Sequence, residues 1–207
     1  MTPTSPAFAA RDVSRETIER LSAFEALLRK WNPAINLVAR STIDDVWQRH
    51  FHDSIQIFDA APGSARLWAD FGTGGGFPGL VVAILAANER QGLRTVLIES
   101  DQRKAAFLAT AVRNLELNAI VLAERAEAVE PLGADIVSAR ALAPLTVLLE
   151  LAERHLAPGG TALFPKGAGH SAELARALDK WSFTHHKTPS KTDPDAVILS
   201  IGGIRRV

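Results

Sequence analysis

The stretch ADFGTGGGFPG, residues 69–79, decides the fold because it joins two apolar runs of different kinds. Residues 66–69 indicate a short buried strand, and residues 80–87 indicate a helix packed against a sheet. Glycines between a strand and a helix let the backbone turn sharply and bring its N–H groups close to a ligand. Pro78 suits the first turn of that helix, where its missing N–H has no partner to lose. The stretch therefore predicts a nucleotide-type binding loop.

Two ligands fit this loop. Residues 74–79 match the dinucleotide pattern G-x-G-x-x-G, which is weakly specific on its own. Alternatively, Asp70 with Gly72, Gly74 and Gly76 forms the acidic, glycine-rich loop of S-adenosylmethionine enzymes. A carboxylate at this point repels a pyrophosphate and attracts the positive amino and sulfonium groups of S-adenosylmethionine. The loop thus favours the methyl donor, with a dinucleotide and a glycine turn without ligand as the alternatives.

The composition indicates a globular intracellular protein. The 207 residues, 47% of them hydrophobic, suffice for one domain with a substantial core. We expect a cytoplasmic protein without a membrane segment, because the first residues lack a signal-peptide pattern and no run has the length of a spanning helix. The absence of cysteine excludes disulfides, thiolate-bound zinc and a cysteine nucleophile. With a net charge of zero, nucleic-acid binding requires a local basic patch.

Residues 1–62 are predicted to form a helical extension ahead of the first strand. A loose tail over residues 1–12 precedes Ser14, a candidate N-cap followed by apolar residues at helical spacing. This helix should end at residues 32–33, since the residue before a proline is pushed out of the α region. A second helix is predicted to begin at residues 41–44, which resemble a capping box.

Residues 63–207 are predicted to form the main domain, an α/β fold of the Rossmann type. Further strands are expected over residues 95–98, 120–122, 134–137, 161–164, 181–186 and 196–201, and further helices over residues 102–117, 145–156 and 171–180. Apolar strands that alternate with helices favour a mostly parallel, seven-stranded sheet with helices on both faces.

In such a sheet the ligand lies at the carboxyl ends of the strands. Glu99 closes the second strand, where an acid accepts both ribose hydroxyls of S-adenosylmethionine or of NAD equally well. Ala126 and Glu127 follow the third strand and either frame an adenine or belong to a plain loop. Arg140 follows the fourth strand, where its fork of donors suits a methionine carboxylate, a substrate phosphate or an ion pair at a helix start. These residues and the glycine loop should meet at one rim.

Several short motifs along the chain match one family in order. They are Trp31-Asn32, Asn36-Leu37-Val38, Arg49-His50, Asp53-Ser54, residues 70–79, Glu99-Ser100, Lys104, Arg140-Ala141, Pro144-Leu145 and Pro165-Lys166-Gly167. From about Leu27 to its C-terminus the chain resembles the RsmG family, also called glucose-inhibited division protein B. The resemblance implies a class I methyltransferase that transfers a methyl group from S-adenosylmethionine to N7 of a guanine in 16S rRNA. It also implies S-adenosylhomocysteine as the product, no metal, and the small ribosomal subunit as the partner.

The loop, the strand ends and the resemblance together define the expected site. The residues expected to bind the cofactor are Asp70, Gly72, Thr73, Gly74, Gly76, Phe77, Glu99, Ala126, Glu127 and Arg140. The candidates for positioning the substrate are Arg140, Lys166, His50 and Asp53, and the candidates for binding RNA are Lys104, Lys166 and Arg49. His50 and Asp53, three residues apart, are interpreted as a structural or substrate-orienting pair and not as a metal site, since no third ligand is apparent.

The chemistry of guanine N7 agrees with what the sequence lacks. N7 carries a lone pair and no proton, so its attack on a sulfonium methyl needs alignment and no general base. Residues 138–145, SARALAPL, lack the motif of enzymes that methylate exocyclic base amines. Three other functions stay open: a methyltransferase for another RNA, a protein or a small molecule; an NAD(P)-dependent oxidoreductase; and an RNA-binding assembly factor without turnover. We expect a monomer.

Overall fold

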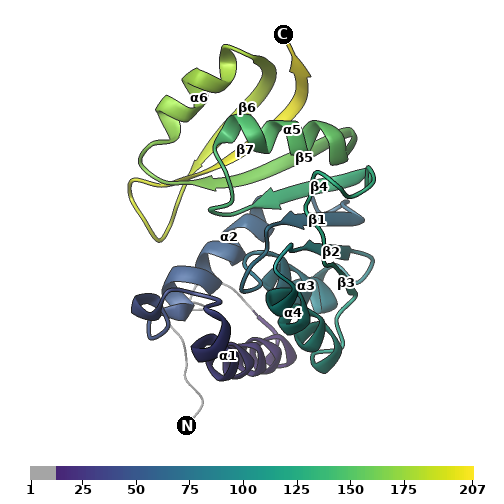
Figure 1. Cartoon of the computed structure of the whole chain (residues 1–207), viewed down its shortest axis with the longest axis vertical. Helices are drawn as coiled ribbons and strands as arrows, with labels where there is room; N and C mark the ends of the chain where they lie inside the picture. Colours follow the sequence, from purple (N-terminus) through teal and green to yellow (C-terminus); the bar gives the residue numbers. More distant parts are fainter. Residues whose placement is uncertain (1–12) are drawn as a thin grey trace.

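Seven strands hydrogen-bond into one sheet in the computed structural model, which describes residues 13–207 (Figure 1). The predicted tail over residues 1–12 lies outside the described residues. The strands are β1 (Leu67–Phe71), β2 (Arg94–Ile98), β3 (Ala119–Leu122), β4 (Ala134–Ala139), β5 (Leu156–Lys166), β6 (Trp181–Pro189) and β7 (Val197–Arg206). Their order is β3-β2-β1-β4-β5-β7-β6, and β7 runs antiparallel to β5 and β6 whereas the first five strands are parallel. The strand order reverses between β1 and β4, which is where such sheets bind ligands.

Helices cover both faces of the sheet, as the sequence predicts. They are α1 (Arg15–Ile35), α2 (His52–Ala60), α3 (Gly79–Glu89), α4 (Gln102–Asn114), α5 (Leu145–His155) and α6 (His170–Leu178). One core cluster joins Trp68 of β1 to α1–α4, and a second joins Ala69 and Phe71 to α5 and α6. In Figure 1, α3 and α4 lie beside β1–β3 with α1 packed against these two helices, while α5 and α6 accompany the other half of the sheet. Neighbouring side chains of β1, such as Trp68 and Ala69, therefore point to opposite faces of the sheet.

The first helix begins as predicted and ends later than predicted. Ser14 is its N-cap, with Oγ accepting the N–H of Thr17. The expected end at residues 32–33 is wrong, because α1 includes Pro33 and continues to Ile35, with Asn36 in the left-handed conformation as C-cap. The buried Asn32 side chain accepts the N–H of Val38 at 2.9 Å through Oδ1. This contact and the core packing of α1 outweigh the local effect of the proline.

The second helix also begins later than predicted. Residues Arg40–Thr42 form a 3₁₀ turn, and a π-helical turn over Trp47–Phe51 leads into α2. The hydroxyl of Thr42, expected within the capping box, donates instead to the carbonyl of Ala39 at 2.9 Å. The π turn leaves Arg49 exposed and buries Phe51. Single π turns frequently occur at functional sites.

The helical extension and the sheet share one hydrophobic core. Phe24 of α1 contacts Phe51, Phe77 and Phe107, with ring centroids 5.3, 5.3 and 6.4 Å away. Phe77 belongs to the glycine-rich stretch, so α1 packs directly behind the predicted binding loop. Within residues 13–207, no helix combines the length and the apolar character that crossing a membrane requires.

We predict that Asn32→Ala lowers the free energy of unfolding by about 1–3 kcal/mol, because it leaves the buried N–H of Val38 without an acceptor. Urea unfolding of the variant measures the change. The matched control is Asn114→Ala at an exposed helical position, which should stay within about 0.5 kcal/mol of the wild type. Equal stability of the two variants would contradict the role of Asn32.

Candidate active site

The carboxylate of Asp70, at the end of β1, connects four parts of the fold. It is fully buried and accepts hydrogen bonds from Thr73 Oγ1, from Ser138 Oγ at 2.6 Å and from the N–H of Gly79 at 3.0 Å. Trp68 Nε1 in turn donates to Ser138 Oγ at 2.8 Å. Asp70 thereby ties β1 to the glycine loop, to the first residue of α3 and to β4.

Burial dominates the electrostatics of Asp70. It raises the pKa of the carboxyl group to about 6, although three hydrogen bonds and the charge of Arg140 act in the opposite direction. Gly79 has to be a glycine, because a Cβ there would lie 2.7 Å from Asp70 Oδ2 and 2.3 Å from a methyl of Leu97. Both oxygens of the Asp70 carboxylate accept hydrogen bonds from groups inside the protein, so Asp70 shapes the loop. The predicted direct contact of Asp70 with a cofactor stays a prediction.

Three glycines give the loop after β1 its curvature. Gly72, Gly74 and Gly76 have φ values of +60°, +55° and +95°, a region that other residues rarely adopt. At Gly74 an added Cβ would meet only the carbonyl oxygen of Gly72, at 3.7 Å, so this position faces open space. At Gly72 an added Cβ would lie 2.5 Å from Leu142 Cδ1, which means that Leu142 packs over the first glycine.

Glu99 lies against this loop at the end of β2. Its buried carboxylate accepts the N–H of Gly74 at 2.9 Å through Oε2 and the N–H of Asp101 at 2.8 Å through Oε1. A carboxylate has about four acceptor directions, so each oxygen keeps one for a further donor. The two backbone N–H groups therefore orient an acceptor pair suited to the two hydroxyls of a ribose.

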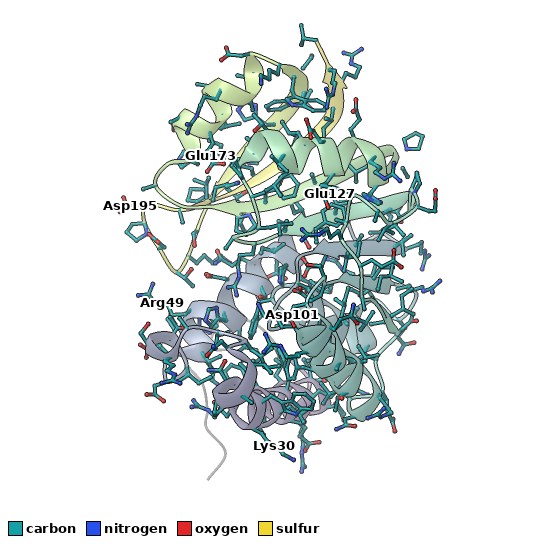
Figure 2. All side chains as sticks on the ribbon, in the orientation of Figure 1. Lys30, Arg49, Asp101, Glu127, Glu173 and Asp195 are labelled. Carbon is teal, nitrogen blue, oxygen red and sulfur yellow. The ribbon has the colours of Figure 1, made fainter. Side chains whose placement is uncertain are left out.

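The loop after β3 is held by α5. The carbonyl of Ala126 accepts a hydrogen bond from His155 Nε2 at 2.9 Å, and Ala126 is buried. Glu127 is exposed and is labelled in Figure 2. The predicted contact of these two residues with an adenine stays a prediction.

Arg140 joins the end of β4 to the helical extension. Its guanidinium lies over the ring of Phe77, 5.2 Å from the centroid, and 3.9 Å from Asp53 Oδ2. It also donates to the backbone carbonyl of Arg49 at 3.4 Å. The candidate residues Arg140, Asp53 and Phe77 therefore meet in space, although they lie far apart in the sequence.

His50 stacks on Phe77 of the same cluster and does not pair with Asp53. Its ring lies 5.1 Å from that of Phe77, and its Nε2 lies 3.0 Å from Thr42 Oγ1. Burial, together with the charges of Arg140 and Arg49, lowers the pKa of His50 to about 4, so the imidazole is neutral at pH 7. Asp53 is engaged by Thr192, Gln56 and Arg140, so the two side chains do not contact each other, and their expected role in orienting the substrate stays a prediction.

A cavity of about 760 Å³ adjoins this cluster. It is lined by Asp53, Gln56, residues 140–146, Pro165, Lys166, Gly167, Glu173, Arg176, Ser190, Asp193, Ala196, Val197 and Ile198. Its wall combines cations, carboxylates and apolar side chains, a combination found in small-molecule binding sites. Figure 2 labels Arg49, Glu173 and Asp195 on this side of the molecule, from the helical extension, α6 and the loop between β6 and β7.

Lys166 is fixed in the wall of this cavity. Its Nζ donates to Glu173 at 2.8 Å and to the carbonyl of Ala143 at 3.1 Å, and its side chain is only 10% exposed. Glu173 also accepts the N–H of Leu145 at the start of α5. Lys104, in the first turn of α4, lies outside the cavity lining. The RNA contacts expected of Lys104, Lys166 and Arg49 stay predictions.

Sequence reasoning missed four residues of this region, Gln56, Leu142, Glu173 and Thr192, and it placed Ser138 at the rim without a role of its own. Ser138 has a weak local signal, since a hydroxyl in an apolar strand needs a partner. The others act through partners distant in the chain, which no local pattern indicates. Within residues 13–207 no group of three His, Asp or Glu side chains is arranged to hold a metal ion.

Comparisons with solved structures define the fold class. A methyltransferase from Geobacter sulfurreducens matches with a TM-score of 0.59 and 17% identity, covering 88% of this chain and 87% of that one. An O-methyltransferase from Bacillus cereus, solved in complex with SAH, matches with a TM-score of 0.56 and 15% identity over 94% of each chain. The chain therefore has the class I methyltransferase fold.

Sequence relatives define the family. The family model described as rRNA small subunit methyltransferase G, GidB, matches residues 17–196. A protein of that name from Cereibacter sphaeroides is 55% identical over 199 residues, 96% of this chain and 97% of the relative. One from Ruegeria pomeroyi is 54% identical over 196 residues, 95% of this chain and 96% of the relative. The chain belongs to the rRNA small subunit methyltransferase G family, which confirms the resemblance inferred from its motifs.

We predict that the contribution of Asp70 to stability falls as the pH rises. Because its pKa is raised in the folded state, the folded protein holds this proton more tightly than the unfolded chain between the two pKa values. The stability advantage of the wild type over Asp70→Asn, a neutral analogue, should shrink by about 2 kcal/mol between pH 4 and pH 6. Urea unfolding across this range measures the difference, and a difference that is constant or grows with pH would contradict the prediction.

Proposed function

We propose that this protein is an S-adenosylmethionine-dependent methyltransferase that methylates N7 of a guanine in 16S rRNA. The observation that carries the proposal is the Glu99 carboxylate, held by Gly74 and Asp101 against a glycine loop of a class I fold. Family membership supports the substrate, since the relatives are named ribosomal RNA small subunit methyltransferase G. The expected setting is the cytoplasm, where ribosomal RNA is available.

The residues of the site fit the cofactor. Glu99 keeps two acceptor directions for the ribose hydroxyls, and the open side of Gly74 gives the ligand close access to the backbone. Arg140 is a cation beside Phe77, suited to the carboxylate of the methionine part or to a phosphate of the substrate. S-Adenosylmethionine supplies a methyl group bound to a positively charged sulfur.

The protein contributes alignment to this reaction. Guanine N7 has a lone pair in the plane of the ring and no proton, so the transfer requires no general base. The site agrees with this requirement, because the lowered pKa of His50 makes its imidazole a weak base, and Lys166 is held by Glu173. The cavity beside Arg140 is large enough for a nucleoside and has both charged and apolar walls. A base taken out of its RNA stack would be held there next to the donor.

We expect the purified protein to transfer labelled methyl groups from S-adenosylmethionine to 16S rRNA in small ribosomal subunits that lack the modification. Nuclease digestion and mass spectrometry should identify 7-methylguanosine as the product. Calorimetry with S-adenosylhomocysteine and with NAD(P) checks the cofactor separately. If the protein binds S-adenosylhomocysteine but no label enters rRNA, the proposed substrate is wrong. If it binds NAD(P) and not S-adenosylhomocysteine, the proposed methyl-transfer reaction is wrong.

We further predict that Gly74→Asp abolishes binding of S-adenosylhomocysteine, with at least a hundredfold loss of affinity in calorimetry. The new carboxylate would lie beside that of Glu99, in the space that the ligand requires. The matched control is Gly133→Asp, which has a similar φ of +63° and open space around its Cβ, and which precedes β4 at the opposite end of the strand from Arg140. Equal affinity of the two variants would mean that the ligand binds elsewhere.

A further inference from the structure

The loop joining β6 to β7, residues 190–196, is fastened to α2 by side-chain hydrogen bonds, most of them made by Gln56. Gln56 Nε2 lies 3.3 Å from both Ser190 Oγ and Thr192 Oγ1, and Gln56 Oε1 accepts the N–H of Lys191 at 2.8 Å. Both polar atoms of the carboxamide are thus directed at this loop, more than 130 residues further along the chain. Asp195, labelled in Figure 2, belongs to the same loop.

Asp53, one turn before Gln56 on α2, reinforces the attachment and extends it to the site. Its Oδ1 accepts hydrogen bonds from Thr192 Oγ1 and from Gln56 Nε2, and its Oδ2 lies 3.9 Å from Arg140. Arg140 in turn lies over Phe77 of the glycine-rich stretch. The loop, α2 and the end of β4 therefore form one connected set of polar contacts.

The loop is a wall of the cavity without being part of either hydrophobic core. The cavity lining includes Ser190, Asp193 and Ala196 of this loop. None of residues 190–196 is buried, and the tip of the loop, Asp193 to Asp195, is exposed to solvent. The described attachment to α2 consists of the hydrogen bonds of Gln56 and Asp53. Segments held by a few partly exposed hydrogen bonds open far more often than the sheet that carries them.

We propose that Gln56 and Asp53 are positioning residues that hold the loop over residues 190–196 closed as the outer wall of the target cavity. The proposal rests on the proposed function, because the wall acts on a nucleoside seated beside the methyl donor. Opening the loop admits the RNA segment, and closing it restricts the base to orientations in which N7 faces the methyl group. Gln56 affects the methyl transfer through the loop and contacts neither the cofactor nor the reacting atoms.

Hydrogen exchange tests the attachment without any substrate. In the wild type the amide of Lys191 is protected by Gln56 Oε1. In Gln56→Ala we expect exchange in a peptide covering residues 187–196 to become at least tenfold faster, with no change in β1 or α3. The matched control is Gln48→Ala, at an exposed position of the same helical extension, which should leave the exchange unchanged. Equal exchange in the wild type and in Gln56→Ala would overturn the proposal.

Single-turnover methylation of unmodified small subunits tests the positioning role. With Gln56→Ala we expect at least a tenfold slower methyl transfer at saturating subunits, and dissociation constants for S-adenosylhomocysteine and for the subunits within about threefold of the wild type, since alignment acts on the rate and not on phosphate contacts. A transfer rate within twofold of the wild type would overturn the proposal, as would a loss of cofactor affinity equal to the loss of rate.

Gln56→Glu gives a readout that a merely structural role would not produce. The new carboxylate would face Asp53, whose charge is also influenced by Arg140, His52 and Asp193. Two adjacent carboxylates repel when both are ionised and share a hydrogen bond when one is protonated. Relative to the wild type, we expect the transfer rate of Gln56→Glu to rise several-fold as the pH falls from 8 to 6. A ratio that does not change with pH would contradict the role of the attachment.

The two proposals fail in different ways. If the wild type transfers no methyl group to rRNA, the proposed function fails, and hydrogen exchange still shows whether Gln56 holds the loop. If the wild type is active and the Gln56 variants match it in rate and exchange, the attachment has no role and the proposed function stands.

Discussion

The buried carboxylate of Asp70 is the contact on which the arrangement of the site depends. It lies at the point where the strand order reverses, and its two oxygens fix the glycine loop, the first residue of α3 and β4 in one geometry. Burial of an acid is unfavourable, and the three donors and the charge of Arg140 offset only part of this effect, since the pKa stays raised. The fold thus accepts a local electrostatic cost in order to fix the shape of the loop, as strained or costly features at functional sites often do.

From this contact the site extends outward through two acids and one cation. Glu99 is oriented by an N–H of the loop that Asp70 fixes, and Arg140 lies over Phe77 at the end of the same stretch. The helical extension adds Asp53, His50 and the carbonyl of Arg49 around Arg140. The extension therefore contributes side chains to the site as well as apolar surface to the core.

The sequence predicted the sheet, its covered faces and the position of the glycine loop, because these depend on local apolar patterns and on glycines. It predicted the ends of the N-terminal helices poorly. Pro33 remains helical because the buried side chain of Asn32 accepts a hydrogen bond from the N–H of Val38 after the helix. The hydroxyl of Thr42 contacts the carbonyl of Ala39 and His50, and the capping box predicted around it does not form. Tertiary contacts overrode local rules at both places.

For the site, the residue types at the strand ends could be interpreted from the sequence, but the hydrogen-bond partners of these residues could not. Glu99 and Arg140 lie at the expected rim, but Asp70 faces into the protein, and the attachment of Gln56 to Thr192 joins positions far apart in the sequence. The most direct test of the account is a crystal structure with S-adenosylhomocysteine. The account predicts that the ribose hydroxyls lie on Glu99, beside Gly74, with the hydrogen bonds of Asp70 to Ser138 and Gly79 intact. Ligand bound away from Glu99, or loss of the hydrogen bonds of Asp70 to Ser138 and Gly79, would contradict the account.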